Sequence, residues 1–161
     1  MVVEKTIIIT GSGKDEEFSN LICAGLRKLG VTYERRVASA HKTPKKLLKI
    51  LKEYEGSGDR IVYVTVAGRS NALSGFVDAN MIYPVIACPP YSNEFGGLDI
   101  YSSLRMPSGV SPLVILDPKN AALAAAKILS LSNPELRKRL LKYHQNMKVI
   151  VEKDDERLRR P

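Results

Sequence analysis

Apolar and polar positions follow two periods along this chain, one typical of buried strands and one of amphipathic helices. Short apolar runs predict strands at 6–10, 60–67, 84–88 and 112–117, the first of them fully buried, and VTYERRVA predicts another strand at 31–38. Between these runs, apolar residues recur every three or four positions, which is typical of helices. We expect helices at 15–29, 44–54, within 68–80, at 97–105, at 120–131 and at about 134–154, with a frayed tail at 155–161.

Residues that commonly begin or end helices flank several of these segments. Gly30 follows the first helix as a C-terminal stop. Thr43 and Pro44 predict an N-cap and first helical position, and Asn133 is expected to cap the last helix.

The alternation of strands and helices predicts an α/β fold with three layers, a five-stranded parallel sheet covered by helices on both faces. Either a flavodoxin-like or a Rossmann-like arrangement suits the length of 161 residues, with a long C-terminal helix added. We expect a single domain over 1–161, because the chain is too short for two independent cores.

This fold class predicts where a ligand binds. In open parallel sheets, ligands lie beyond the carboxyl ends of the strands. The first four strands are followed by GSGKD, SAHK, GRSN and PPYSN. We therefore expect these polar, small-residue loops to gather along one edge of the sheet.

Charge and composition argue against several classes of function. The net charge is +8, but 137–160 holds nine Lys/Arg and four Asp/Glu, so most of the excess lies in the last helix. Aromatic residues do not interleave with these cations, which argues against nucleic-acid binding. The longest apolar run is interrupted by Lys127, so no membrane span is expected, and without a signal-peptide pattern we expect a cytoplasmic protein. Cys23 and Cys88 lack metal-ligand spacing, so no metal site is expected.

The strand-end loops hold the candidate chemistry. TGSGKDEE opens a helix and could hold an anion, although a plain turn with Ser12 or Asp15 as N-cap explains it equally well. It matches neither the P-loop nor GxGxxG. In SAHK, His41 can exchange a proton near neutral pH. Residues 69–71 could bind an anion or cap the next helix, and His144 is expected to be a solvated or packed residue of the last helix.

These motifs resemble a known family. GSGKD, SAHKTP, AGRSNALSG, PVIACPP and SSLRMPSGV stand in the order and at about the spacing of the phosphoribosylaminoimidazole carboxylase family of purine biosynthesis. The resemblance runs from about Thr6 to Leu131. One branch of that family is a mutase, and the other, class II, carboxylates aminoimidazole ribonucleotide (AIR) directly with CO2.

Three features resemble class II more than the mutase. The chain has Lys42 where the mutase pattern has Arg, AGRSNALSG lacks the second histidine of AGGAAHLPG, and CPP follows the fourth predicted strand. It also departs from the family at Lys14, Thr43 and Ala72, and Lys14 puts in doubt a hydroxyl contact from that position. The mutase stays open as an alternative, as does a non-enzymatic nucleotide-binding module.

The resemblance implies a function and a site. The activity is the reversible, ATP-independent carboxylation of AIR to 4-carboxy-5-aminoimidazole ribonucleotide (CAIR), with no cofactor. His41 is implied as the catalytic acid–base group. The implied substrate-binding residues are Ser12, Asp15, Ser39 and Lys42 at the phosphoribosyl end, and Gly68, Arg69, Ser70 and Asn71 at the ring and CO2. The resemblance also implies a homo-oligomer, commonly an octamer, with sites completed by neighbouring subunits, and we expect segment 89–110 to act as a lid.

Overall fold

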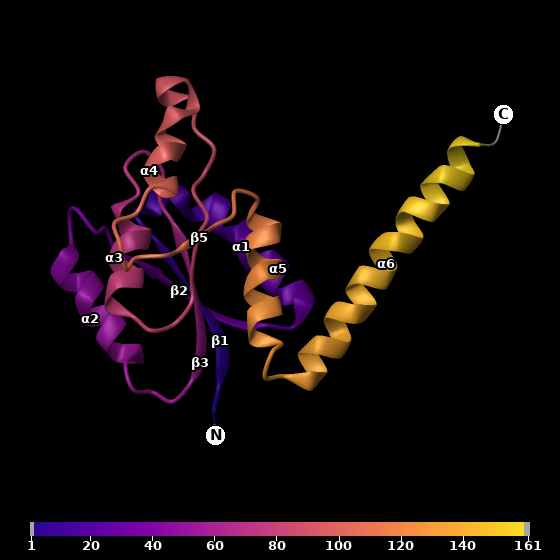
Figure 1. Cartoon of the computed structure of the whole chain (residues 1–161), viewed down its shortest axis with the longest axis horizontal. Coiled ribbons are helices and arrows are strands. Elements are labelled where there is room, and N and C mark those ends of the chain that lie inside the picture. Colours follow the sequence, from indigo (N-terminus) through magenta and orange to yellow (C-terminus); the bar gives the residue numbers. More distant parts are fainter. Residues whose placement is uncertain (1, 160–161) are drawn as a thin grey trace.

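A parallel sheet of five strands forms the centre of the computed structural model, which describes residues 2–159 (Figure 1). Its spatial order is β2-β1-β3-β4-β5, which is the flavodoxin-like arrangement. The three-residue apolar run Ile7–Ile9 lies in the interior strand β1 and is buried on both faces. The predicted α/β class and parallel sheet are therefore confirmed. The strands are β1 Glu4–Thr10, β2 Thr32–Val37, β3 Arg60–Val66, β4 Val85–Ala87 and β5 Leu113–Val114.

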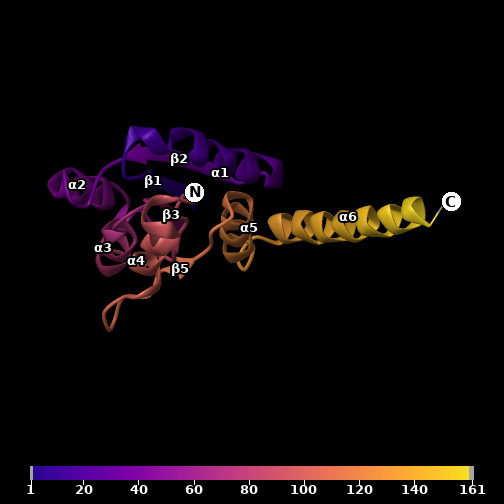
Figure 2. The same cartoon turned by 90° about the horizontal axis from the view of Figure 1, so that it is seen from above.

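Helices cover both faces of this sheet, as the three-layer prediction requires (Figure 2). Ile8 points to the layer of α1, α5 and the start of α6, whereas Ile7 and Ile9 point to the layer of α2 and α3. This alternation follows from the two-residue period of a strand. The helical elements are η1 Gly13–Asp15, α1 Glu16–Leu29, α2 Pro44–Tyr54, α3 Ala72–Asn80, η2 Glu94–Ile100, α4 Tyr101–Leu104, α5 Pro118–Leu129 and α6 Pro134–Leu158.

The predicted helix boundaries are largely confirmed. Gly30 adopts the left-handed conformation after α1, with φ of 70°. The Asn133 side chain accepts a hydrogen bond from the backbone N–H of Leu136 and so caps α6. Thr43 does precede Pro44 at the start of α2, but its side chain makes no capping bond to that helix.

Two boundaries were predicted wrongly. The fifth strand shrinks from 112–117 to Leu113–Val114, because Asp117 instead caps α5, which begins at Pro118. The last helix continues through four residues of the expected frayed tail, to Leu158. Ion pairs between Asp154 and Arg157 and between Asp155 and Arg159 lie on this extension. Residues 160–161 of the predicted tail lie outside the described part.

The long helix α6 projects from the rest of the molecule (Figures 1 and 2). Only its first half packs on the core, where Leu136 and Leu140 are buried against α1 and α5. Leu141, Met147 and Ile150 remain exposed in the single chain. Among residues 2–159, no helix combines the length and hydropathy needed to span a bilayer.

Candidate active site

The strand-end loops meet at a single cavity of about 560 Å³. It lies at the point of the sheet where the strand order reverses, with β2 on one side of β1 and β3 on the other. Ligands of doubly wound sheets bind at this position. Eight of the nine predicted site residues line the cavity, namely Ser12, Asp15, Ser39, His41, Lys42, Gly68, Arg69 and Ser70.

The first loop places the beginning of a helical segment at the cavity. Ser12 Oγ donates a hydrogen bond of 2.9 Å to Asp15 Oδ2, and neither side chain caps a helix. Ser12 and Asp15 do occupy the N-cap positions of η1 and α1, as the capping alternative expected, but their side chains make no capping bond. η1 runs directly into α1, with the Glu16 N–H donating to the Gly13 carbonyl oxygen, and the positive end of the helix dipole at this loop favours an anion nearby.

The second loop is a tight turn that presents His41. Thr43 Oγ1 accepts from the Ser39 N–H at 2.9 Å and is also 3.3 Å from the Ser39 carbonyl oxygen. Ser39 Oγ accepts from the Lys42 N–H at 3.1 Å, and the Thr43 N–H donates to the Ser39 carbonyl at 2.9 Å. Thus Thr43 closes this turn, and His41 stands exposed at its tip.

On the third loop, Asn71 differs from the other predicted site residues because its side chain does not line the cavity. Its side chain is buried, accepts from the Ser74 N–H at 3.2 Å and from Ser74 Oγ at 2.7 Å, and donates to Ser103 Oγ at 2.9 Å. Asn71 therefore caps α3 and does not line the cavity with His41. Arg69 lines the cavity, but its guanidinium donates to Glu94 Oε1 at 2.7 Å.

The fourth loop contributes residues that the sequence did not single out. Pro90, Tyr91 and Ser92 follow β4 and complete one wall of the cavity. The sequence signal was their place in PPYSN directly after a predicted strand, although nothing in that pattern marked Tyr91. The tyrosine is 87% exposed, so the single chain leaves this side of the cavity open.

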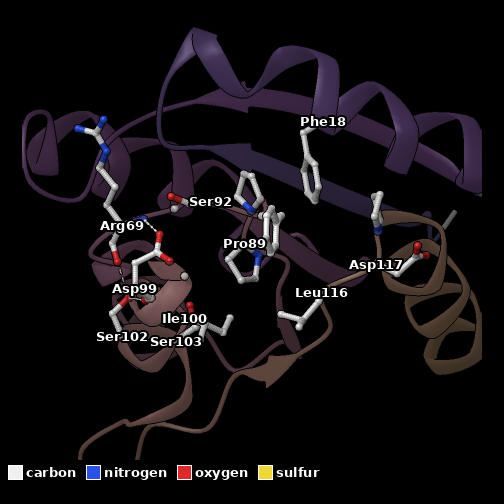
Figure 3. A pocket seen from close by; sticks show the side chains of 15 residues that line it. Phe18, Arg69, Pro89, Ser92, Asp99, Ile100, Ser102, Ser103, Leu116 and Asp117 are labelled. Carbon is white, nitrogen blue, oxygen red and sulfur yellow. Dashed lines mark hydrogen bonds between the residues drawn. The ribbon is translucent and has the colours of Figure 1, made fainter. Parts of the chain in front are cut away.

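A second, mainly apolar cavity of about 470 Å³ adjoins the first (Figure 3). It shares Gly68, Arg69, Pro90, Tyr91 and Ser92 with the first cavity. Its other walls include Phe18, Pro89 and Leu116, whose side chains face one another in Figure 3. The two cavities together offer a polar compartment beside an apolar one.

Charge in the polar cavity favours an anionic ligand. Lys14, Lys42 and Arg69 line it, against one carboxylate, Asp15. Cys88, at the end of β4, is a poor nucleophile because burial raises the pKa of its thiol to about 12. The histidine and the cations are therefore the groups best placed for chemistry in this cavity.

Comparison with known proteins decides the family. The family model described as AIR carboxylase matches residues 5–149. The chain belongs to the AIR carboxylase family. A phosphoribosylaminoimidazole carboxylase of Archaeoglobus fulgidus is 53% identical over 155 residues, which cover 96% of this chain and 85% of that protein. The phosphoribosylaminoimidazole carboxylase of Treponema denticola is 47% identical over 154 residues, covering 96% and 97% of the two chains.

A solved structure agrees with these sequence relationships. The crystal structure of Treponema denticola PurE superposes with a TM-score of 0.95 at 46% identity, covering 98% of this chain and 99% of that one. The resemblance found in the motifs is thereby confirmed, together with the flavodoxin-like fold. As a member of the AIR carboxylase family, the protein is a carboxy-lyase of purine biosynthesis.

Proposed function

We propose that this protein carboxylates AIR with CO2 to give CAIR, reversibly and without ATP. The observation that carries the proposal is the position of His41, which shares one cavity with the first helical segment and with Lys14 and Lys42. This cavity combines a proton-exchanging group with a site for an anion. A ribonucleotide has its phosphate and its reactive ring at opposite ends, so it needs both.

The phosphoribosyl group is assigned to the first two loops. Lys42 supplies a fixed positive charge, and Ser39 and Ser12 supply hydroxyl groups, all on the cavity wall. Asp15 disfavours a phosphate, and as an acceptor-only carboxylate it suits ribose hydroxyl groups. The positive end of the helix dipole at the start of η1 and α1 adds to the attraction for the phosphate.

His41 is assigned the proton on ring carbon C4. The amino-substituted imidazole is electron-rich, so C4 attacks the carbon of CO2 and forms the new carbon–carbon bond. The ring then carries a proton on C4 that must leave to restore aromaticity, and His41 accepts it. In the reverse direction His41⁺ returns the proton to C4 and CO2 departs. These reaction steps account for every bond and proton without a metal, biotin or ATP.

The third loop is assigned to the ring and to CO2. Gly68, Arg69 and Ser70 line the cavity, and the backbone of Gly68 allows close approach. Because its side chain is used within the protein, Asn71 contributes by fixing this loop and the start of α3. The adjoining, mainly apolar cavity suits uncharged CO2. Segment 89–110 is the proposed lid.

Lys42 and the third loop favour class II over the mutase. The mutase pattern has Arg at the position of Lys42 and a second histidine after the third strand, where this chain has residues 69–74 without one. Purified protein should therefore form CAIR from AIR plus bicarbonate, in proportion to dissolved CO2. Efficient conversion of the N-carboxylated ribonucleotide would instead establish the mutase. Ribonucleotide binding with neither reaction would favour a non-enzymatic binding module.

Substitution of His41 tests the assigned chemistry. His41→Asn should abolish turnover while ribonucleotide binding, measured by calorimetry, and the fold are kept. His144→Asn is the matched control, because His144 is exposed on α6 and does not line the cavity. Carboxylation near the unsubstituted level by the His41 variant would overturn its role.

Substitution of Lys42 tests the phosphate site. Lys42→Ala should raise the Michaelis constant for AIR with a smaller effect on kcat, because the charge binds a part of the substrate that does not react. Lys45→Ala, an exposed lysine on α2 outside the cavity, is the control. An unchanged Michaelis constant for the Lys42 variant would argue against phosphate binding.

We also propose a homo-oligomer, an octamer by family resemblance, that completes each site from neighbouring subunits in the cytoplasm. Its support is the apolar surface left uncovered in the single chain, on α6 and at Tyr91, Phe95 and Tyr101 near the cavity. A dry pocket for CO2 needs this side covered. Light scattering should give the mass of an octamer, and a monomer at micromolar concentration would refute it.

A further inference from the structure

Arg69 has an unusual backbone conformation inside the proposed site. Its φ is +59°, in the left-handed region that side chains other than glycine rarely adopt. Such a conformation persists only where surrounding contacts hold it, and it is common at functional sites. Contacts from other parts of the chain must therefore hold this loop.

Two side chains about thirty residues away hold the backbone of Arg69 from both sides. Asp99 Oδ2 accepts a hydrogen bond from the Arg69 N–H at 3.0 Å. Ser102 Oγ donates to the Arg69 carbonyl oxygen at 2.7 Å, and it accepts from the Asn71 N–H at 3.0 Å. Figure 3 shows the Asp99 carboxylate turned toward the Arg69 backbone, while the guanidinium extends away from Pro89 and Leu116.

The ion pair of Arg69 with Glu94 explains this conformation less well. The two side chains are 74% and 53% exposed, and exposed pairs contribute little. The pair also fixes the guanidinium, which lies several rotatable bonds from the strained φ angle. The bond from Asp99, by contrast, is made to the backbone N–H itself and involves a charged acceptor.

We propose that Asp99 is a positioning residue for the carboxylation, holding Arg69 in its left-handed conformation so that residues 68–70 face the ring and CO2. This inference rests on the proposed function. Asp99 borders the adjoining apolar cavity but not the cavity that contains His41, which Gly68, Arg69 and Ser70 line. Its Oδ2 accepts the hydrogen bond of the Arg69 N–H, so it acts through the loop. Loss of its carboxylate should therefore impair the reaction with CO2 more than the binding of the ribonucleotide.

The first test compares Asp99→Ala with Asp99→Asn. The alanine variant should lower kcat/KM for CO2 about tenfold or more, as expected for a lost hydrogen bond to a charged group, while the Michaelis constant for AIR stays within about twofold. The asparagine variant keeps an oxygen acceptor for the Arg69 N–H, so its kcat/KM should stay within about threefold of the unsubstituted protein.

The second test uses glycine to remove the conformational strain. In an Arg69→Gly background, position 69 adopts the left-handed region without steric penalty, so Asp99→Ala should then lower kcat/KM by only about twofold. The same coupling should appear in thermal unfolding, where Asp99→Ala lowers Tm by about 2–4 °C with Arg69 and by less than half as much after Arg69→Gly.

Two controls exclude simpler explanations. Glu94→Gln breaks the ion pair without touching the Arg69 backbone, so Asp99→Ala should lower kcat/KM by the same factor with and without Glu94→Gln. Asp78→Ala removes an equivalent carboxylate, whose Oδ2 accepts from the Ser111 N–H at 2.7 Å and anchors the far end of the same irregular segment. It should lower Tm without changing the ratio of kcat to the Michaelis constant for AIR.

The outcomes separate the two proposals. Equal losses from Asp99→Ala in the original protein and in the Arg69→Gly background would overturn the positioning role, as would an unaffected reaction with CO2. If the unsubstituted protein carboxylates nothing, the proposed function fails. In that case the unfolding measurements still decide whether Asp99 holds Arg69, because the coupling in Tm requires no substrate.

Discussion

The contact between α1 and α5 depends on a glycine at the centre of α1. A Cβ atom placed on Gly25 would lie 2.7 Å from Ala122 Cβ. Carbon atoms in good contact are about 3.5–4.0 Å apart, so Gly25→Ala must push the helices apart by about 1 Å. Ala122 is fully buried, and its methyl group has no rotamer by which to avoid the new atom.

Helix propensity and packing make opposite predictions for this substitution. Alanine stabilises a helix interior by about 1 kcal/mol relative to glycine. Overpacking of a tight contact costs about 1–3 kcal/mol. The cost here lies near the upper end of that range, because only a shift of the two helix backbones can relieve the clash. We therefore expect Gly25→Ala to lower the free energy of unfolding by about 1–2 kcal/mol. For a chain of this size, Tm then falls by about 2–4 °C per kcal/mol.

Urea unfolding at one fixed protein concentration measures this free energy, with Ala122→Gly and the double variant alongside. Ala122→Gly alone should cost about 2 kcal/mol, from helix propensity and the lost buried methyl group. The double variant exchanges glycine and alanine between the helices, so it should lie within about 1 kcal/mol of the unsubstituted protein. A Gly25→Ala protein as stable as the original, or more stable, would refute the packing argument.

Three further predictions concern α6, an ion pair and the thiols. Asn133→Ala should lower the free energy of unfolding by about 1–2 kcal/mol in urea titrations, because it removes the cap of α6. The bond from Lys5 lowers the pKa of Glu34 below 4.5, so the stability gap between the original protein and Glu34→Gln should be constant above about pH 5 and shrink as pH falls below 4.5. A gap that grows in acid would contradict this sign. Cys23 and Cys88 are buried with raised pKa, so a thiol reagent at about pH 7 should modify both only after urea unfolding.

Local sequence patterns were sufficient for most of the fold. Runs such as Ile7–Ile9 mark strands that are buried on both faces, and a helix end such as Gly30 is set by its own backbone. The fifth strand was overestimated because apolar content alone does not show where strand pairing ends. Pairing stops after Val114, and Asp117 then turns toward α5. That choice depends on neighbours that the local pattern does not contain.

The candidate site was predictable to the level of loops. Strand ends of a parallel sheet must share one edge, so parallel pairing alone places GSGKD, SAHK and GRSN along the same edge. The sequence did not show that Asn71 turns inward to cap α3, nor that Tyr91 forms a cavity wall. Both depend on the path of the chain after a strand ends, where no periodicity constrains it.

By itself, the sequence determined the helices and strands, the parallel pairing of the strands and the sheet edge that holds the candidate site residues. These features follow from local periodicity and chain connectivity. Only the tertiary structure decided the order β2-β1-β3, the turn closed by Thr43 around His41, and the bond from Asp99 to Arg69. The bond from Asp99 joins residues thirty positions apart. Such a contact leaves no local pattern, because folding brings its two partners together only after both loops have been placed by the sheet.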